Sequence, residues 1–221
     1  MSKYYWCSEK TKKKVEEEEL PPEEGPPPII LMGDPGGGPP DSCVEVIDNT
    51  IMFYGEVNEK NAKTLNKAIR TLDKELQVFK LKFGCESPPL KLFINSYGGS
   101  VFAGFSMMDT IKNCTTPVHT YVDGSAASAA TLISVVAKKR FIFPNSFMLI
   151  HQLSSSMWGN YESMKDEMEN LDLIMGKIKK IYKEHTSMNM RQITEILKKD
   201  KWFEAEKCLE LGLVDEIVEN G

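Results

Sequence analysis

The alternation of apolar strand-like runs with helical segments, from residue 44 onward, limits the possible folds more than any other feature. The runs LKLFIN (residues 90–95) and FMLIHQ (residues 147–152) are apolar on both faces, which is typical of strands in a sheet covered on both sides. Other segments have helical spacing, in which apolar residues recur every three or four positions. Because strands and helices alternate, the sequence predicts an α/β fold with largely parallel strand pairing.

The positions of these elements follow from the same pattern. Strands are expected in residues 44–57 (two, around a turn at Asp48 and Asn49), 90–95, 117–124 and 139–152 (two). Helices are expected in residues 58–76, 100–114, 126–137 and 161–182.

Residues 1–42 differ in composition from the rest of the chain. Eight of the twelve prolines and five of the fifteen glycines lie in residues 19–40. The segment also holds nine acidic side chains and five lysines, so four of the five net negative charges of the chain lie in it. Because it can bury too little apolar surface to offset the entropy of ordering, we expect residues 1–42 to form a disordered acidic extension. Its apolar patch PIILMG is a candidate docking element.

Charge and cysteine content exclude several classes of function. The net charge of −5 gives no basic surface for nucleic acid. The five cysteines are scattered without metal-ligand spacing, so we expect no metal site and no bound cofactor, and reduced thiols in a cytosolic protein. The first residues lack the apolar core of a signal peptide, and no run reaches the roughly 18 apolar residues of a membrane span. We therefore expect a cytoplasmic location, including a plastid or host-cell cytoplasm, and no contact with membranes.

The most regular pattern in the chain lies in residues 161–182. Apolar side chains recur there by three and four through three heptads: Tyr161, Met164, Met168, Leu171, Met175, Ile178 and Tyr182. Charged residues fill the other faces of the predicted helix. This apolar seam fits a helix that packs on its own domain and equally a helix that packs on a partner subunit.

Three short segments could together form a serine hydrolase site. Ser128 lies in the first turn of the predicted apolar helix, where free backbone N–H groups can stabilise an oxyanion. Ser125 is a second candidate nucleophile, although its place after Gly124 suits a helix N-cap better. The paired glycines in residues 94–104 allow backbone close to a ligand, and His151 is a candidate general base. Each feature alone is more often structural than catalytic.

In their order along the chain these segments resemble the Clp protease proteolytic subunit family, the ClpP-type serine peptidases of the crotonase-like fold. INSYGGSV resembles the family's INSPGGSV, GSAASAAT resembles its nucleophile box, and PNSFMLIHQL resembles its box with the catalytic histidine. KDKWFEAEKCLELGLVDEI resembles its C-terminal box. The resemblance covers about residues 44–218. It implies a protease domain over residues 43–221, with a spiral core of repeated β-β-α units and a protruding long-helix handle at about residues 154–185.

The resemblance also implies a reaction and the residues that perform it. A serine endopeptidase of this family would use Ser128 as nucleophile, His151 as general base and Asp200 as the group that orients the histidine. Asp166 and Asp172 lie on the predicted long helix and are poorer candidates for the third role. The backbone N–H groups of Gly99 and Ala129 would form the oxyanion hole.

The resemblance also implies binding partners, and the chain departs from the family's sequence at several positions. The resemblance implies stacked heptameric rings joined through the handle, unfolded polypeptide substrates, and a Clp-type AAA+ ATPase partner that alone uses ATP. SSSMWGN (residues 154–160) would form the handle strand that pairs with a substrate peptide. Tyr97 and Leu153 stand where the family has proline, SAAT replaces SMGA, and the acidic extension replaces a short apolar N-terminal segment.

Alternatives to an unfoldase-fed protease stay open at this point. The chain could be a ClpP-like protease that acts without an unfoldase, as in phage capsid maturation. It could also be a catalytically silent subunit of a mixed ring. A crotonase-fold acyl-CoA enzyme is the third alternative, but the order of serine, histidine and aspartate favours a protease.

Overall fold

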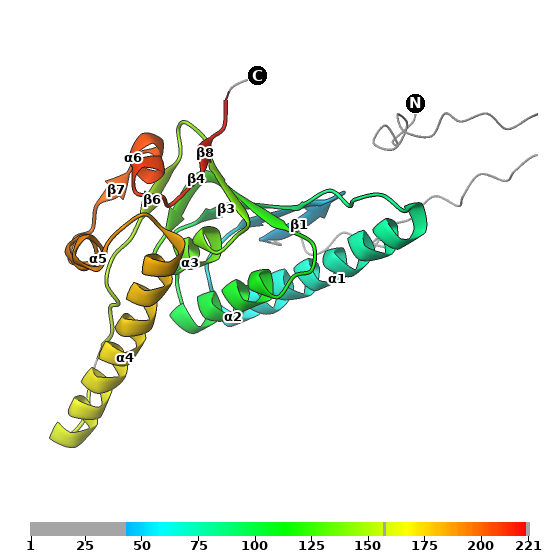
Figure 1. Cartoon of the computed structure of the whole chain (residues 1–221). Helices are drawn as coiled ribbons and strands as arrows, with labels where there is room; N and C mark the ends of the chain where they lie inside the picture. The colour runs from blue at the N-terminus through cyan, green and yellow to red at the C-terminus, as the bar shows by residue number, and fades with distance from the viewer. Residues whose placement is uncertain (1–42, 157, 220–221) are drawn as a thin grey trace, which may run out of the picture.

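The computed structural model describes residues 43–156 and 158–219 and places a mixed sheet at the centre of the fold (Figure 1). Its strands are β1 (Val44–Ile47), β2 (Thr50–Tyr54), β3 (Leu90–Ser96), β4 (Val118–Ala127), β5 (Lys139–Ile142), β6 (Phe147–Leu149), β7 (Trp202–Phe203) and β8 (Glu216–Ile217). The helices are α1 (Glu59–Phe83), α2 (Val101–Lys112), α3 (Ala129–Val135), α4 (Tyr161–His185), α5 (Met190–Leu197) and α6 (Ala205–Glu210).

Parallel pairing dominates the sheet. The strand order is β1-β2-β3-β4-β5-β8, and β6 also pairs with β4 while β7 pairs with β6. The pairs β2–β3, β3–β4, β4–β5, β4–β6 and β5–β8 are parallel, and the pairs β1–β2 and β6–β7 are antiparallel. The predicted α/β class is therefore confirmed, including the hairpin of β1 and β2 around the turn at Asp48 and Asn49.

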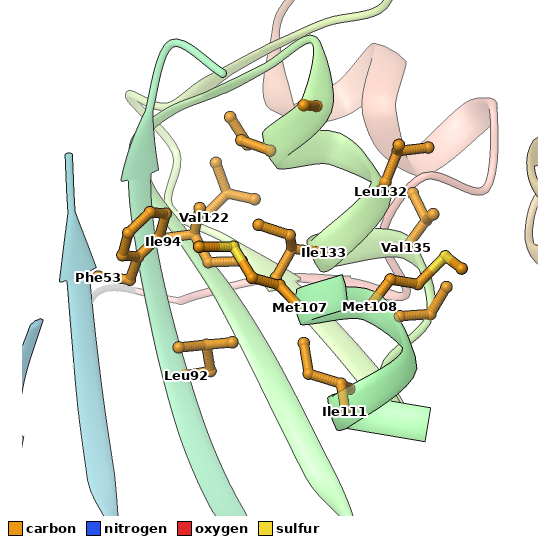
Figure 2. Close-up of a cluster of buried hydrophobic side chains, with 14 of the residues drawn as sticks. Phe53, Leu92, Ile94, Met107, Met108, Ile111, Val122, Leu132, Ile133 and Val135 are labelled. Carbon is orange, nitrogen blue, oxygen red and sulfur yellow. The ribbon is translucent and has the colours of Figure 1, made fainter. Parts of the chain in front are cut away.

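Helices cover one face of the sheet and bury its core there. Helix α1 packs against α2, and α2 packs against α3. The buried side chains come from the strands and from the helices above them (Figure 2), among them Phe53, Leu92, Ile94, Met107, Ile111, Val122, Leu132 and Ile133. Burying this many apolar side chains, each worth about 1.5–3 kcal/mol, holds the helical layer on the sheet.

The opposite face of the sheet is only half covered, and this differs from the expectation for LKLFIN. Along β3 the side chains alternate between buried and half-buried positions. Phe93 stacks on Tyr121 with ring centroids 4.7 Å apart, and Tyr121 stacks on Phe141 at 4.6 Å. These aromatic residues are as apolar as residues of the core. The sequence alone therefore does not indicate that they form a row on a partly open face of the sheet.

Two predicted element boundaries need correction. Helix α1 continues to Phe83, past the predicted end at residue 76, and it stops at Gly84, whose left-handed φ of 60° ends the helix with a bond to Lys80. The apolar helix begins at Ala129 and not at Ala126, because residues 125–127 belong to β4 and pair with β6. The small residues of GSAASAAT thus end a strand before they begin a helix.

Helix α4 extends away from the sheet, as the prediction of a protruding handle helix requires (Figure 1). Only its C-terminal half reaches the core, through Ile178, Ile181 and Tyr182. Residues 154–156 and 158–160, before the helix, form no strand in the described part of the chain, so the expected handle strand is not seen.

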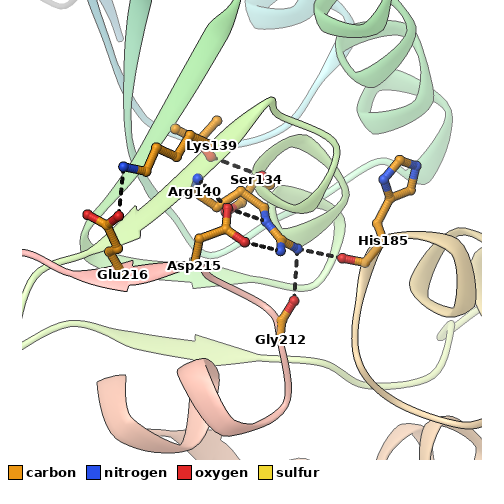
Figure 3. A network of polar contacts seen from close by, with 8 residues as sticks. Ser134, Lys139, Arg140, His185, Gly212, Asp215 and Glu216 are labelled. Carbon is orange, nitrogen blue, oxygen red and sulfur yellow. Dashed lines mark hydrogen bonds and ion pairs between the residues drawn. The ribbon is translucent and has the colours of Figure 1, made fainter.

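Arg140 ties the base of α4 to the C-terminal part of the chain (Figure 3). Its guanidinium forms a two-pronged contact with the carboxylate of Asp215, with N–O distances of 3.1 and 2.5 Å. The same group donates to the carbonyl oxygens of His185 and Gly212 at 2.5 and 2.8 Å. The hydrogen bonds and charge of Arg140 hold the pKa of Asp215 below its ordinary value. Three segments distant in sequence are therefore fixed at one point.

Two sequence-based expectations concern features beyond this core. The predicted disordered extension, residues 1–42, lies outside the described residues. Within the residues that the structure does describe, no helix combines the length and apolar character that crossing a bilayer requires.

Candidate active site

Ser128 lies at the sharp turn from β4 into α3. Its backbone has φ 54° and ψ −125°, a left-handed conformation that costs a non-glycine residue free energy unless its neighbours fix it. The side chain is half-buried and makes no capping hydrogen bond to α3, so its hydroxyl is not used by the helix that it precedes. Strained turns of this kind occur at functional sites, where they direct a side chain out of the fold.

Ser125 does not cap the helix, contrary to the expectation. It lies inside β4, and its hydroxyl donates a hydrogen bond of 3.1 Å to Oδ1 of Asn95. The residue in the N-cap position of α3 is Ser128 itself. Ser125 is thus buried and engaged in a structural contact, which leaves the half-buried Ser128 as the candidate nucleophile at the turn.

The turn is held by hydrogen bonds on both sides of Ser128. The N–H of Ser128 donates to the carbonyl oxygen of Leu149 in β6 at 2.8 Å. The carbonyl oxygen of Ser128 accepts from the hydroxyl of Thr131 at 2.6 Å. That hydroxyl also lies 2.5 Å from the hydroxyl of Tyr182 on α4. Because a hydroxyl has one proton and Thr131 gives it to Ser128, Tyr182 must donate to Thr131.

Gly98 forms the backbone wall opposite Ser128. Its φ is 95°, and a Cβ added there would lie 2.7 Å from Cβ of Ser128 and 3.1 Å from the backbone nitrogen of Ala129. Only a residue without a side chain allows the two turns to approach this closely. The paired glycines of the sequence thus place backbone against the nucleophile turn, as predicted for a close backbone approach.

Gly99 presents its N–H group away from the neighbouring loop. Val57 donates to the carbonyl oxygen of Gly98 at 2.8 Å and accepts from the N–H of Ser100 at 2.7 Å, which makes Val57 and Gly99 a parallel bridge. In such a bridge the N–H of the central residue points away from the partner strand. The N–H of Ala129, in the first turn of α3, likewise has no acceptor within its helix.

His151 and Asp200 meet from distant parts of the chain. His151 follows β6, and Asp200 lies between α5 and β7, which pairs with β6 through Met148 and Phe203. The Nδ1 atom of His151 lies 3.1 Å from Oδ1 of Asp200. The imidazole side chain is 28% exposed and the carboxylate side chain is 79% exposed, so the pair lies at an open surface.

This contact selects one form of the imidazole ring. A carboxylate accepts a hydrogen bond, so Nδ1 of His151 carries the proton and Nε2 keeps its lone pair. Two backbone hydrogen bonds join the segments that carry these three residues. The carbonyl oxygen of Leu149, two residues before His151, accepts from the N–H of Ser128, and the carbonyl oxygen of Leu197 accepts from the N–H of Gln152 at 2.8 Å. A serine hydroxyl, an imidazole with a free nitrogen and an orienting carboxylate are the groups of a nucleophilic triad.

The remaining candidates of the sequence analysis lie elsewhere. Asp166 and Asp172 are exposed on α4, and their carboxylates make no contact with His151 among the residues described. Within residues 43–156 and 158–219, no group of three or more histidine, cysteine, aspartate or glutamate side chains could hold a metal ion.

Thr131 and Tyr182 support the site and were missed by the sequence analysis. In the sequence Tyr182 is only the last apolar position of the heptad seam. The sequence pattern does not indicate that its hydroxyl reaches the turn after β4. Burial raises the pKa of Tyr182 well above its ordinary value, so the hydroxyl stays protonated and able to donate. Tyr97 was noted only as a departure from proline, but its ring packs edge-on against Trp202 with centroids 6.0 Å apart, next to the Gly98 wall.

Sequence and structure comparisons place this chain in one family. The sequence profile of the Clp protease family matches residues 42–221. The "ATP-dependent Clp protease proteolytic subunit" of Streptococcus mutans is 33% identical over 177 residues, covering 78% of this chain and 86% of that protein. The "ATP-dependent Clp protease proteolytic subunit 1" of Streptomyces avermitilis is 38% identical over 133 residues, covering 59% of this chain and 61% of that protein. In this and one further curated relative, the match thus spans about three fifths of the relative's length.

A solved structure agrees with the profile. ClpP1 from Listeria monocytogenes superposes with a TM-score of 0.66 at 27% identity, over 79% of this chain and 93% of that one. A mutant of the same protein gives a TM-score of 0.68 at 28% identity, over 78% of this chain and 92% of that one. The predicted ClpP-like fold is confirmed, and the chain belongs to the Clp protease family.

Proposed function

We propose that this chain is a serine endopeptidase and that Ser128, His151 and Asp200 form its catalytic triad. The observation that supports the proposal most directly is the 3.1 Å contact between Nδ1 of His151 and Asp200, which leaves Nε2 available as a base. The strained and uncapped Ser128 at the neighbouring turn provides the nucleophile. Membership of the Clp protease family agrees with this assignment.

The proposed reaction proceeds in two halves. The hydroxyl oxygen of Ser128 attacks the carbonyl carbon of a peptide bond while Nε2 of His151 takes the hydroxyl proton. The histidine then gives that proton to the leaving amine, and an acyl-enzyme remains. A water molecule attacks the acyl group in the same way and regenerates Ser128. Asp200 stabilises the imidazolium that forms in each half.

The oxyanion of each tetrahedral intermediate needs hydrogen-bond donors. We assign this role to the N–H groups of Gly99 and Ala129, one directed away from Val57 and the other in the first turn of α3. Backbone donors do not depend on the side chain, so Ala129 in place of the family's methionine is compatible with activity. Donors of this kind are worth about 10²–10³ in rate each.

The proposed assembly follows from the handle helix. The buried half of its seam packs on the core through Ile178 and Tyr182, whereas Tyr161, Met164 and Met168 on the other half are 76%, 42% and 50% exposed. An exposed apolar row at heptad spacing fits a second helix of the same kind. We propose that the handles join two heptameric rings, which enclose the active sites and admit unfolded polypeptides.

A Clp-type AAA+ ATPase is the proposed partner that delivers substrates, with ATP used by that partner alone. The cytoplasm is the proposed location, in agreement with the scattered cysteines Cys43, Cys114 and Cys208, which form no disulfide among the described residues. Capture of the protein on an immobilised Clp ATPase in the presence of ATP separates this function from that of a protease working without an unfoldase.

Covalent labelling tests the catalytic assignment. A fluorophosphonate reacts with an activated serine hydroxyl, and we expect mass spectrometry to find it on Ser128. The Ser128→Ala variant should take up no label, and Asp200→Asn should slow labelling by about 10³-fold or more. The matched control is Ser125→Ala, which removes the neighbouring hydroxyl and should still be labelled. Labelling of Ser125, or label that persists in Ser128→Ala, contradicts the proposal. Absence of label in the assembled wild-type protein would favour a silent ring subunit.

A further inference from the structure

A groove between α1 and α2 has a concentrated positive charge that the proposed reaction does not use. It has a volume of about 500 Å³, and Asn66 and Ser106 lie in its wall beside four basic side chains of α1: Lys63, Lys67, Arg70 and Lys74. All four basic residues are exposed. In this wall Nδ2 of the buried Asn66 donates to Oγ of Ser106 at 2.9 Å and so joins the two helices.

The four cations form one row along α1, which we call the α1 basic row. Their spacing by three and four residues puts them on the same side of the helix. The row spans twelve residues from Lys63 to Lys74, which is about 16 Å of helix. Within the part of the chain that the structure describes, none of the four forms a salt bridge, and Arg70 has only a long contact of 3.5 Å with the hydroxyl of Thr110.

A row of unpaired cations beside a polar groove fits an acidic peptide. Such a peptide in extended form advances about 3.3 Å per residue, so roughly five residues would follow the whole row. Each exposed pair of a glutamate and a basic side chain contributes little binding free energy, but the contributions of several such pairs along one row add up. The chain itself contains a segment of this kind: VEEEELPPEE, residues 15–24, has six glutamates and no basic residue.

The described chain begins beside the first turn of α1. A Cβ added at Gly55 would lie 2.6 Å from Cβ of Cys43 and 3.8 Å from Nδ2 of Asn61. Burial raises the pKa of the Cys43 thiol, and the nearby charge of Lys60 acts in the opposite direction, which places Lys60 of α1 close to Cys43. The segment that precedes Cys43 therefore joins the described chain next to the end of α1 at which the α1 basic row begins. The nineteen residue-to-residue steps from Glu24 to Cys43 can reach about 60 Å, more than the length of the row.

We propose that residues 15–24 dock in the groove between α1 and α2 of the same molecule, with their glutamates on the α1 basic row. Attachment through a short linker gives the segment a local concentration of the order of millimolar, so weak pairs suffice to fill the groove. This role for the acidic extension is independent of the catalytic assignment and concerns the helical face of the molecule.

Zero-length cross-linking with a carbodiimide tests the docking on the full chain. The reagent joins a carboxylate to an amine only when the two touch, and we expect products between residues 16–24 and Lys63, Lys67 or Lys74. An equal mixture of ¹⁴N- and ¹⁵N-labelled protein, mixed as subunits before assembly, should yield products within one isotope only. Products that mix the isotopes would mean that another copy fills the groove, and would overturn the proposal.

Charge variants give the matched controls. Lys67→Glu together with Arg70→Glu should lower the yield at Lys63 and Lys74 roughly tenfold, because two attractive pairs become repulsive. Lys82→Glu, outside the groove on the same helix, should leave the yield unchanged. Adding Glu17→Lys and Glu18→Lys to the Lys67→Glu and Arg70→Glu variant should restore cross-linking between the acidic segment and α1. No products at the α1 basic row, or an equal yield at Lys82, would refute docking.

Discussion

Ser128 holds a backbone conformation that its own side chain disfavours, and two hydroxyl groups help to maintain it. Thr131 donates to the carbonyl oxygen of Ser128, and Tyr182 donates to Thr131 from the handle helix. The position of the proposed nucleophile therefore depends on a residue 54 positions away in the sequence. The chain of hydroxyls is buried, so each missing bond leaves an unpaired polar group and costs about 1–3 kcal/mol.

The Tyr182→Phe variant tests this dependence. It removes the donor to Thr131 without changing the shape of the buried ring, and we expect severalfold slower fluorophosphonate labelling of Ser128 and about 1 kcal/mol lower stability. Tyr161→Phe, at the exposed end of the same helix, is the control and should change neither quantity. An unchanged labelling rate in Tyr182→Phe would show that the turn is held without this bond.

At the scale of single residues, the motifs located the proposed triad but not the reason for its geometry. Ser128, His151 and Asp200 follow from the resemblance of short boxes to a family. The helix cap at Ser125 was wrong, because small residues fit the end of a strand as well as the start of a helix, and pairing of β4 with β6 decides between them. The role of Tyr182 could not be predicted, since its contact is tertiary.

Helix α4 combines two environments in one element. Its C-terminal half packs on the core, and its N-terminal half projects with apolar side chains exposed (Figure 1). The spacing of apolar residues predicts the helix and its seam but fits equally a seam that faces the domain and one that faces a partner. In the structure the C-terminal half of the seam packs on the domain, and the N-terminal half is exposed because the domain ends midway along the helix. The spacing of apolar residues indicates which of them share a face of the helix, but it does not indicate where along the helix the domain ends.

Met168→Asp tests the proposed role of the exposed half. A carboxylate in an apolar seam between two helices would have to be buried without a partner, so we expect the double ring to separate into single rings of half the mass. Analytical ultracentrifugation measures the change. Asn170→Asp adds the same charge at an exposed position outside the seam and should leave the mass unchanged. An assembly that keeps its mass in Met168→Asp would contradict stacking through the handle.

For the molecule as a whole, Arg140 joins the sheet, the base of α4 and the C-terminal segment. Because Arg140 holds the pKa of Asp215 below its ordinary value, the contact stabilises the fold at pH values above the pKa of about 3.9 that an unfolded chain would have. The stabilisation is lost as the pH falls through the lower pKa of the folded state, where the carboxylate takes up a proton.

Asp215→Asn should therefore lower Tm by roughly 3–6 °C at pH 7, and the difference from the wild type should shrink as the pH falls below about 4. The control is Glu216→Gln, which breaks the neighbouring but exposed ion pair with Lys139 and should change Tm by about 1 °C or less. Differential scanning calorimetry between pH 3 and 8 measures both. A difference that stays constant over this range would show that the carboxylate charge is not the stabilising element.

The sequence predicted the architecture of the whole molecule better than the exposure of its surfaces. The alternation of strands and helices predicted the α/β class, and the resemblance to the family predicted the protruding helix. The expectation that β3 is covered on both faces did not hold, because Phe93, Tyr121 and Phe141 form a half-open stacked row. The burial of a sheet face depends on which elements pack over it, and the apolar character of a strand does not indicate which elements these are.

The antiparallel pairing of β7 with β6 also makes completion of the site depend on a strand that is synthesised late. Ser128 and His151 leave the ribosome well before Asp200, which reaches the imidazole only when β7 has added itself to the edge of β6. On the proposed function, a growing chain or one broken before residue 200 has a nucleophile and a base but no group to orient them. The protease therefore gains its activity last, after the segment that completes its fold has docked.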